Sequence, residues 1–110
     1  MNDSLINKKC IPCEGGTPPL TSDEIKKYLP QLKNQWDVVE DKKITHTFKF
    51  KTFKEAIAFV NKIANLAEKE NHHPNIHILY NRVKIVLTTH SIGGLSENDF
   101  ILAAKIEQLT

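Results

Sequence analysis

Hydrophobic and polar residues alternate along two parts of the chain, which is the pattern of half-buried β-strands. In the segment ITHTFKF, residues 44–50, every second position is Ile, His or Phe, so Phe48 and Phe50 are expected to face the core. The segment WDVVE, residues 36–40, precedes it and is predicted to pair with it across a turn at 41–42. Together the two segments predict an antiparallel hairpin.

A second hairpin is predicted further along the chain. The segments IHILY, residues 76–80, and VKIVLTT, residues 83–89, flank a two-residue turn at 81–82. This turn pairs apolar residues on one face, namely Tyr80 with Val83, Ile78 with Ile85 and Ile76 with Leu87. If the same pairing continues to the open end of the hairpin, His73 lies opposite His90.

Three further segments carry apolar residues at the spacing of an α-helix. The first covers residues 22–33, the second runs from about residue 53 to a point close to Asn71, and the third follows Ser96. A serine or threonine that can cap the helix precedes each segment, and the first two also carry the glutamate of a capping box. The capping residues are Thr21 with Glu24, Thr52 with Glu55, and Ser96. The apolar stripe of the longest helix consists of Phe53, Ala56, Ile57, Val60, Ile63, Ala64 and Ala67.

The predicted elements follow one another in the order α-β-β-α-β-β-α. This order predicts an α+β fold, a two-layer sandwich in which a four-stranded antiparallel sheet carries the helices on one face. The chain has 110 residues, which is the size of one domain. We therefore expect an irregular leader over residues 1–20 and a single domain over residues 21–110.

Charge and hydropathy argue against several classes of function. The formal net charge of +2 arises from 15 basic and 13 acidic residues spread along the chain, so direct nucleic-acid binding is not predicted. No apolar run approaches the ~20 residues that cross a membrane, and the N-terminus lacks the apolar stretch of a secretion signal. We therefore expect a cytoplasmic protein with no membrane partner.

Both cysteines lie in the segment KKCIPCEGG, at Cys10 and Cys13. Two thiols supply only half of the ligands of a structural zinc, and a redox pair normally opens a helix after a strand. The stretch EGGTPPL that follows favours irregular structure instead. These features predict a flexible or loosely docked leader that carries two thiols.

Three of the five histidines are predicted to lie at one rim of the sheet. His72 and His73 follow the second helix, which Pro74 cannot extend, and the hairpin register adds His90. Because imidazole titrates near pH ~6.5, such a group can give or take a proton at neutral pH without a cofactor. The arrangement therefore indicates general acid–base chemistry.

The same residues have other interpretations. Histidines at a helix end interact favourably with the helix dipole, and histidine is also the commonest ligand of transition metals. Asp99, at the third position of the last helix, can complement the dipole of that helix as well as line a pocket. Of the remaining histidines, His77 is expected to be exposed and His46 to be structural.

Several motifs taken together resemble one enzyme family. HHP, YNRVKIVLTTH and GGLSENDFILAAKI, with QWDV and FKF upstream, look like the pterin-4a-carbinolamine dehydratases, and KKCIPCEGG is similar to the leader of bacterial members. The resemblance covers almost the whole chain. It implies the α+β sandwich, a dimer or tetramer, and a hydro-lyase that removes water from 4a-hydroxytetrahydropterin to give quinonoid dihydropterin. No cofactor and no metal are implied. The resemblance implies a place in tetrahydrobiopterin recycling and leaves the upstream enzyme open, with an aromatic amino-acid hydroxylase as one candidate.

The resemblance also implies roles for individual residues. His72 and His90 would act as acid–base groups, and His73 would bind and orient the pterin. The residues implied in substrate binding are Glu68, Pro74 and Asp99. Two alternatives from other classes remain: a dimerisation cofactor for a transcription factor, as some animal relatives are, and a small metal-binding protein.

Overall fold

The computed structural model describes residues 5–11 and 17–110. Its helices are η1 (Leu5–Asn7), α1 (Ser22–Tyr28), η2 (Leu29–Gln31), α2 (Phe53–Glu70), η3 (His90–Ile92) and α3 (Glu97–Glu107), where η denotes a 3-10 helix. Its strands are β1 (Asp37–Val39), β2 (Lys43–Lys49), β3 (Asn75–Leu79) and β4 (Arg82–Leu87). No helix among these described residues is long and apolar enough to span a membrane.

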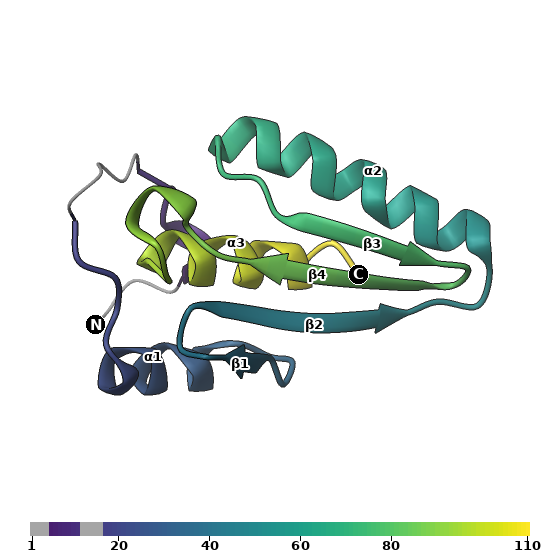
Figure 1. Ribbon diagram of the computed structural model, residues 1–110. Helices are drawn as coiled ribbons and strands as arrows, with labels where there is room; N and C mark the ends of the chain where they lie inside the picture. The colour runs from purple at the N-terminus through teal and green to yellow at the C-terminus, as the bar shows by residue number, and fades with distance from the viewer. Residues whose placement is uncertain (1–4, 12–16) are drawn as a thin grey trace.

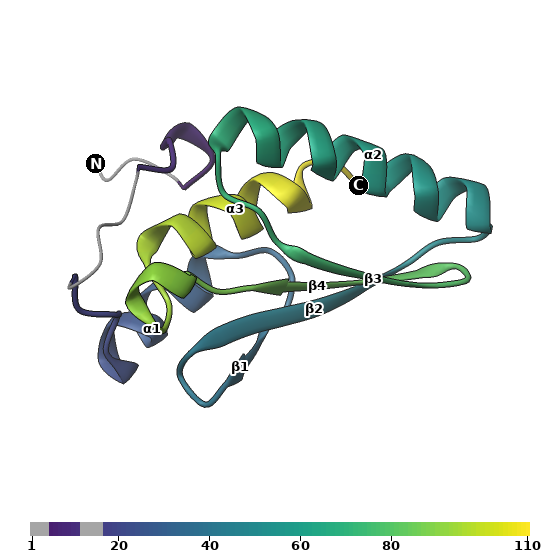
Figure 2. The ribbon, with the colours of Figure 1, turned by 45° about the horizontal axis from the view of Figure 1, so that its top comes forward.

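The four strands form one antiparallel sheet in the order β1-β2-β4-β3 (Figure 1). Helices α2 and α3 lie on one face of this sheet, as the tilted view of Figure 2 shows. The core lies between the two layers, where Ile44, Val83, Ile85 and Leu87 of the sheet are fully buried. The predicted α+β sandwich and its order of elements are therefore confirmed.

Helix α1 begins where the sequence predicts and ends earlier. Thr21 and Glu24 form the predicted capping box, in which each side chain accepts a hydrogen bond from the other residue's backbone N–H. The α-helix stops at Tyr28 and continues only as the 3-10 turn η2, not to residue 33. The physical reason is Pro30, which has no N–H to donate to the preceding turn.

The second hairpin has a different register from the predicted one. Its turn consists of Tyr80 and Asn81, so Val83 pairs with Ile78 and not with Tyr80. Asn81 is bonded to Phe50, since the Asn81 side-chain amide donates to the Phe50 carbonyl and the Phe50 N–H donates to the Asn81 carbonyl, each at 2.8 Å. These bonds hold the turn at residues 80–81, one residue before the predicted turn at 81–82. The strand pairing shifts by two positions, so the paired residues of β3 and β4 keep their predicted faces. Tyr80 is the exception: it was predicted to pair with Val83 on the core face, but it lies in the turn and is 70% exposed.

The register correction also affects the predicted site. Extended towards the open end of the hairpin, the observed pairing no longer places His73 opposite His90. That predicted juxtaposition is wrong. Strand pairing therefore does not bring His73 and His90 together. Any contact between the segments that carry them must be made by side chains outside the strands.

Helix α2 buries a narrower stripe than predicted. Phe59 is 3% exposed and contributes to the core, whereas Phe53 is 48% exposed and Ala64 is also exposed. Thr52 caps the helix as predicted by accepting a hydrogen bond from the Glu55 N–H at 3.1 Å. Phe53 stands at the start of the helix, beside this cap, and so remains in solvent.

Helix α3 is buried on nearly all sides. Beyond the predicted stripe, Phe100, Ile101 and Ala104 are also buried, because the sheet, α2 and the N-terminal η1 surround the helix. Its final residue, Glu107, is 6% exposed and accepts hydrogen bonds from the N–H groups of Lys33 and Asn34 and from the indole of Trp36. One carboxylate therefore fixes the segment between η2 and β1.

Replacing Glu107 by alanine is expected to destabilise the protein. The change leaves three N–H donors without their acceptor, which should lower the free energy of unfolding by about 2–4 kcal/mol. Urea unfolding followed by the fluorescence of Trp36, the only tryptophan, measures this change. The exposed neighbour Gln108, replaced by alanine, is the control and should change stability by less than about 0.5 kcal/mol. Equal stability of the two variants would contradict this role of Glu107.

Candidate active site

The end of helix α2 positions the first histidine. Asn71 closes the helix in the left-handed conformation, with φ 53° and ψ 40°, and the His72 N–H donates to the Ala67 carbonyl at 3.2 Å. This reversal turns the chain back from the helix towards β3. The His72 side chain is 13% exposed, so most of its ring is enclosed while part of it reaches the surface.

The buried carboxylate of Asp99 is hydrogen-bonded to His72 and to two other residues. His72 Nε2 lies 2.7 Å from Asp99 Oδ1, and the Asp99 carboxylate is fully buried. Its second oxygen, Oδ2, accepts hydrogen bonds from the Thr89 hydroxyl at 2.8 Å and from the Ser96 N–H at 3.0 Å. The Asp99 carboxylate thus caps α3, as the helix-dipole interpretation predicts, and also holds the histidine.

Thr89 connects the segment of His90 to this carboxylate. Thr89 is 5% exposed, and its Oγ1 also lies 2.8 Å from the hydroxyl of Ser96. The next residue, His90, opens the 3-10 turn η3 and is exposed. The turn closes through Gly93, whose φ of 70° suits glycine.

Three segments of the chain therefore meet at Asp99. His72 comes from the end of α2, Thr89 from the chain after β4, and Asp99 from the first turn of α3. The sequence predicted that these segments converge, but it attributed the convergence to strand register. The structure achieves it through one buried carboxylate.

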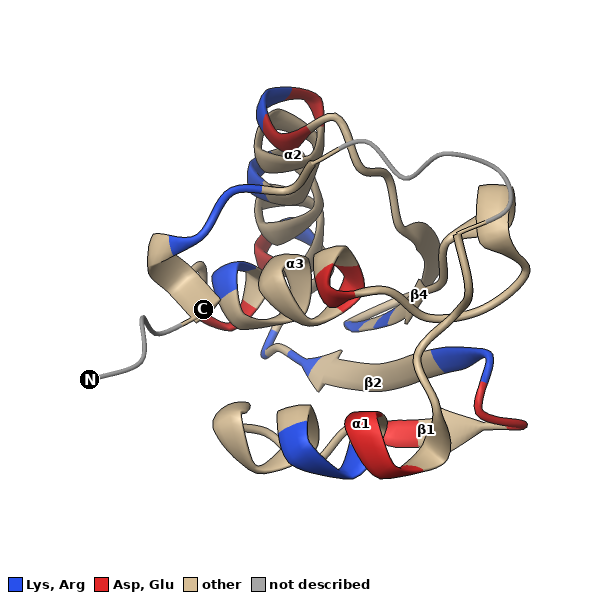
Figure 3. Ribbon diagram, turned by 90° about the vertical axis from the view of Figure 1, so that its left-hand side faces the viewer, with Lys and Arg blue, Asp and Glu red and all other residues tan. Residues whose placement is uncertain are grey.

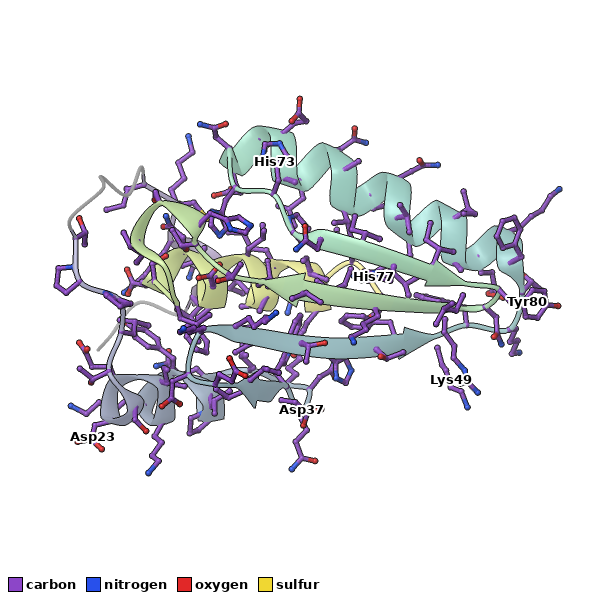
Figure 4. The ribbon with its side chains drawn as sticks, in the orientation of Figure 1. Asp23, Asp37, Lys49, His73, His77 and Tyr80 are labelled. Carbon is purple, nitrogen blue, oxygen red and sulfur yellow. The ribbon has the colours of Figure 1, made fainter. Side chains whose placement is uncertain are left out.

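His73 and Glu68 form a separate pair at the surface. His73 Nε2 lies 2.5 Å from Glu68 Oε2, with the two side chains 56% and 77% exposed. Figure 4 shows His73 at the end of α2. A pair this exposed adds little to stability, and its geometric effect is to hold the His73 ring in one orientation. Pro74 is half-buried and separates the histidine pair from β3.

The remaining two histidines have structural surroundings or face solvent. The Nδ1–H of His46 donates a hydrogen bond to the Gln35 carbonyl at 3.1 Å, and the ring packs against the rings of Trp36 and Phe48. His77 is exposed on β3, opposite Lys84 on β4 (Figure 4). Both agree with the structural and exposed environments predicted for them.

The sequence interpretation missed Glu70, which lies two residues before His72. This buried carboxylate accepts from the Cys10 N–H at 3.0 Å and pairs with Lys105 of α3 at 2.8 Å. Burial alone would raise the pKa of Glu70, but the Cys10 N–H and the Lys105 ammonium hold it below its usual 4.5. The negative charge of a glutamate in the last turn of a helix interacts unfavourably with the helix dipole. That unfavourable position was the feature of the sequence that could have indicated a special role for Glu70.

The depressed pKa predicts an acid-dependent loss of stability. The contribution of Glu70 is fully present above its unfolded-state pKa and is lost as the pH falls through the lower folded-state value. The free energy of unfolding should therefore fall between about pH 5 and pH 3, and it should fall less steeply in Glu70→Gln. Urea titrations at several pH values measure both slopes. Parallel slopes would show that Glu70 does not contribute.

The arrangement around His72 suits proton transfer. An ionised carboxylate only accepts hydrogen bonds, so a neutral His72 must carry its proton on Nε2, the nitrogen that faces Asp99. Its Nδ1 then has a free lone pair. Within residues 5–11 and 17–110, no group of three or more His, Cys, Asp or Glu side chains is arranged to hold a metal ion.

Comparison with known proteins identifies the family. A sequence profile described as pterin 4 alpha carbinolamine dehydratase matches residues 18–109. The chain belongs to this family. A family member from Alkaliphilus metalliredigens is 54% identical over 106 residues, covering 96% of each chain. Another from Rickettsia canadensis is 53% identical over 94% of each chain. Both relatives are named, provisionally, as pterin-4-alpha-carbinolamine dehydratases.

Solved structures of dehydratase-like proteins share the fold. A crystal structure from Brucella melitensis, described as a transcriptional coactivator/pterin dehydratase, has a TM-score of 0.77 and 39% identity. It covers 83% of this chain and 97% of its own. A pterin dehydratase-like protein described as a RuBisCO assembly factor of the alpha-carboxysome has a TM-score of 0.61 at 24% identity, which shows the fold alone.

Proposed function

We propose that this protein removes water from a 4a-hydroxytetrahydropterin to give the quinonoid dihydropterin. The observation that carries the proposal is the bond between His72 and the buried Asp99 in a member of the pterin carbinolamine dehydratase family. That bond fixes the tautomer of the neutral imidazole, whose other nitrogen is available for proton transfer.

The reaction requires two proton transfers. One proton must reach the 4a oxygen, which leaves as water, and another must leave the adjacent ring nitrogen as the C=N double bond forms. In the proposed mechanism His72 and His90 carry out these transfers, one as acid and the other as base. Each such transfer typically contributes about 100- to 10,000-fold to the rate.

The other site residues have binding and positioning roles in this proposal. His73, oriented by Glu68, hydrogen-bonds the pterin, and Pro74 keeps both histidines out of the helix. Asp99 positions His72 directly, and its bond to Thr89 holds the residue that precedes His90. No cofactor is required by the reaction. We also propose a cytoplasmic homodimer or homotetramer that recycles tetrahydrobiopterin after an aromatic amino-acid hydroxylase.

Stopped-flow absorbance tests the proposed reaction. A 4a-hydroxytetrahydropterin is generated immediately before mixing, and formation of the quinonoid dihydropterin is followed with and without the protein. We expect the protein to accelerate this step in proportion to its concentration. An unchanged rate would contradict the proposal.

The description of the Brucella relative favours a second candidate, an interaction protein. On this alternative the chain binds a transcription factor and the histidines contribute nothing to binding. Substitution of His72 separates the two functions, because it should abolish dehydration and leave partner binding intact.

A further inference from the structure

The N-terminal residues 5–11 lie against the ends of two helices that carry site residues. We refer to residues 5–11 as the strap. Figure 2 shows it beside the end of α2, and Figure 3 looks onto this end of the molecule, where acidic residues mark the first turn of α3. Leu5 anchors the strap in the core, with 3% of its surface exposed.

The strap is bonded to the first two residues of α3. Lys8 pairs with Glu97 at 2.9 Å, and the Ile11 N–H donates to Asn98 Oδ1 at 3.0 Å. The Asn98 amide returns a hydrogen bond to the Ile11 carbonyl at 2.5 Å. Asn98 is 5% exposed, so its side of this pair of bonds is buried, whereas Ile11 lies at the surface.

The strap is also bonded to the end of α2. The Cys10 N–H donates to Glu70, whose second oxygen holds Lys105 of α3. Burial, reinforced by the nearby Glu70 carboxylate, raises the pKa of the Cys10 thiol to about 12. A thiol that stays protonated at neutral pH is a poor nucleophile, and the Cys10 thiol instead donates to the Asn98 carbonyl, with Sγ 3.6 Å from the oxygen.

These contacts bracket the His72–Asp99 bond. Glu70 lies two residues before His72, and Asn98 lies immediately before Asp99. The two strap contacts are made by consecutive residues, Cys10 and Ile11, so the ends of α2 and α3 are joined over a short length of chain. The first turn of α3 is held by the strap on one side and by Ser96 and Thr89 on the other.

We propose that Asn98 is a positioning residue and that the strap, through Asn98 and Glu70, sets the geometry of the His72–Asp99 pair. This assigns a role to part of the KKCIPCEGG leader motif, which the dehydratase mechanism itself does not use. Cys13 of that motif lies outside the described residues, and the proposal does not involve it. The effect on turnover rests on the proposed dehydratase function, whereas the effect on the histidine does not.

Two substitutions break the same contact from opposite sides. Asn98→Ala removes the side chain that binds Ile11, and Ile11→Pro removes the N–H that binds Asn98. Ile11 is 67% exposed, so Ile11→Pro loses no core packing and should fold even if Asn98→Ala does not. The control is Thr52→Ala, which removes the N-cap at the far end of α2 and lowers stability without touching the strap.

The experiment uses the full chain with ¹⁵N-labelled histidine. At about pH 8, wild-type His72 should show the nitrogen signals of a single tautomer protonated on Nε2. In Asn98→Ala and Ile11→Pro we expect signals averaged between tautomers, and a kcat about tenfold lower with KM changed less than about twofold. Thr52→Ala should retain the wild-type signals and kcat.

Wild-type His72 signals in both strap variants would overturn the proposal. A loss of kcat no greater than that of Thr52→Ala would overturn it as well. If the wild-type protein does not accelerate dehydration at all, the proposed function fails, and the histidine signals alone decide whether the strap positions His72.

Discussion

Replacing His72 by glutamine is expected to lower kcat for dehydration by at least about 100-fold while the protein remains folded. Glutamine can still donate a hydrogen bond to Asp99, which keeps the buried carboxylate satisfied, but it cannot exchange a proton near neutral pH. The loss therefore isolates proton transfer from packing. Initial rates at saturating substrate measure kcat, and a thermal melt checks the fold.

The matched control is the same substitution at His77. His77 is exposed on β3 and pairs with Lys84 on the opposite strand, away from the Asp99 carboxylate. His77→Gln should keep kcat within about twofold of wild type. His90→Gln should resemble His72→Gln if both histidines transfer protons. A His72→Gln variant as active as His77→Gln would be incompatible with the mechanism.

Replacing Asp99 by asparagine should have an effect of similar size for a different reason. The asparagine oxygen can still accept from Thr89 and Ser96, which places the NH₂ group towards His72. His72 must then accept at Nε2 and carry its proton on Nδ1, the nitrogen proposed to react with the substrate. A histidine held in the wrong tautomer loses activity even when the geometry is intact, and we expect kcat to fall by at least about 100-fold.

Two observations check this prediction. The ¹⁵N signals of His72 should change from the Nε2–H to the Nδ1–H tautomer. The melting temperature should change by only a few degrees, because two of the three bonds to residue 99 persist and the third is reversed. Asp23→Asn makes the same chemical change at an exposed site in α1 (Figure 4) and should leave kcat unaltered. Wild-type kcat in Asp99→Asn would show that the tautomer of His72 does not matter.

Much of the fold could be predicted from local sequence because its signals are local. The alternation in ITHTFKF and the capping box of Thr21 and Glu24 depend only on residues a few positions apart. The hairpin register could not be obtained in this way. It depends on the bonds of Asn81 to Phe50, 31 positions earlier, and both two-residue turns satisfy the same alternation.

The candidate site likewise combines features that local sequence predicts with features that depend on distant residues. The sequence predicted that His72 and His73, before Pro74, follow the end of a helix, and that Asp99 lies in the first turn of the last helix, where it complements the helix dipole; the structure places all three there. The second bond of Asp99, to His72 across 27 positions, has no counterpart in periodicity or spacing. The leader was predicted to be flexible or loosely docked, yet residues 5–11 are bonded to α3 and α2. Those bonds depend on buried polar partners that only the folded chain brings together.

Single-turnover stopped flow with protein in excess over a freshly generated 4a-hydroxytetrahydropterin tests the central claim most directly, because it observes the chemical step without product release. We predict rapid formation of the quinonoid dihydropterin by the wild-type protein and a rate constant at least about 100-fold lower for His72→Gln. Equal rate constants for the two proteins, or no acceleration by the wild type, would contradict it.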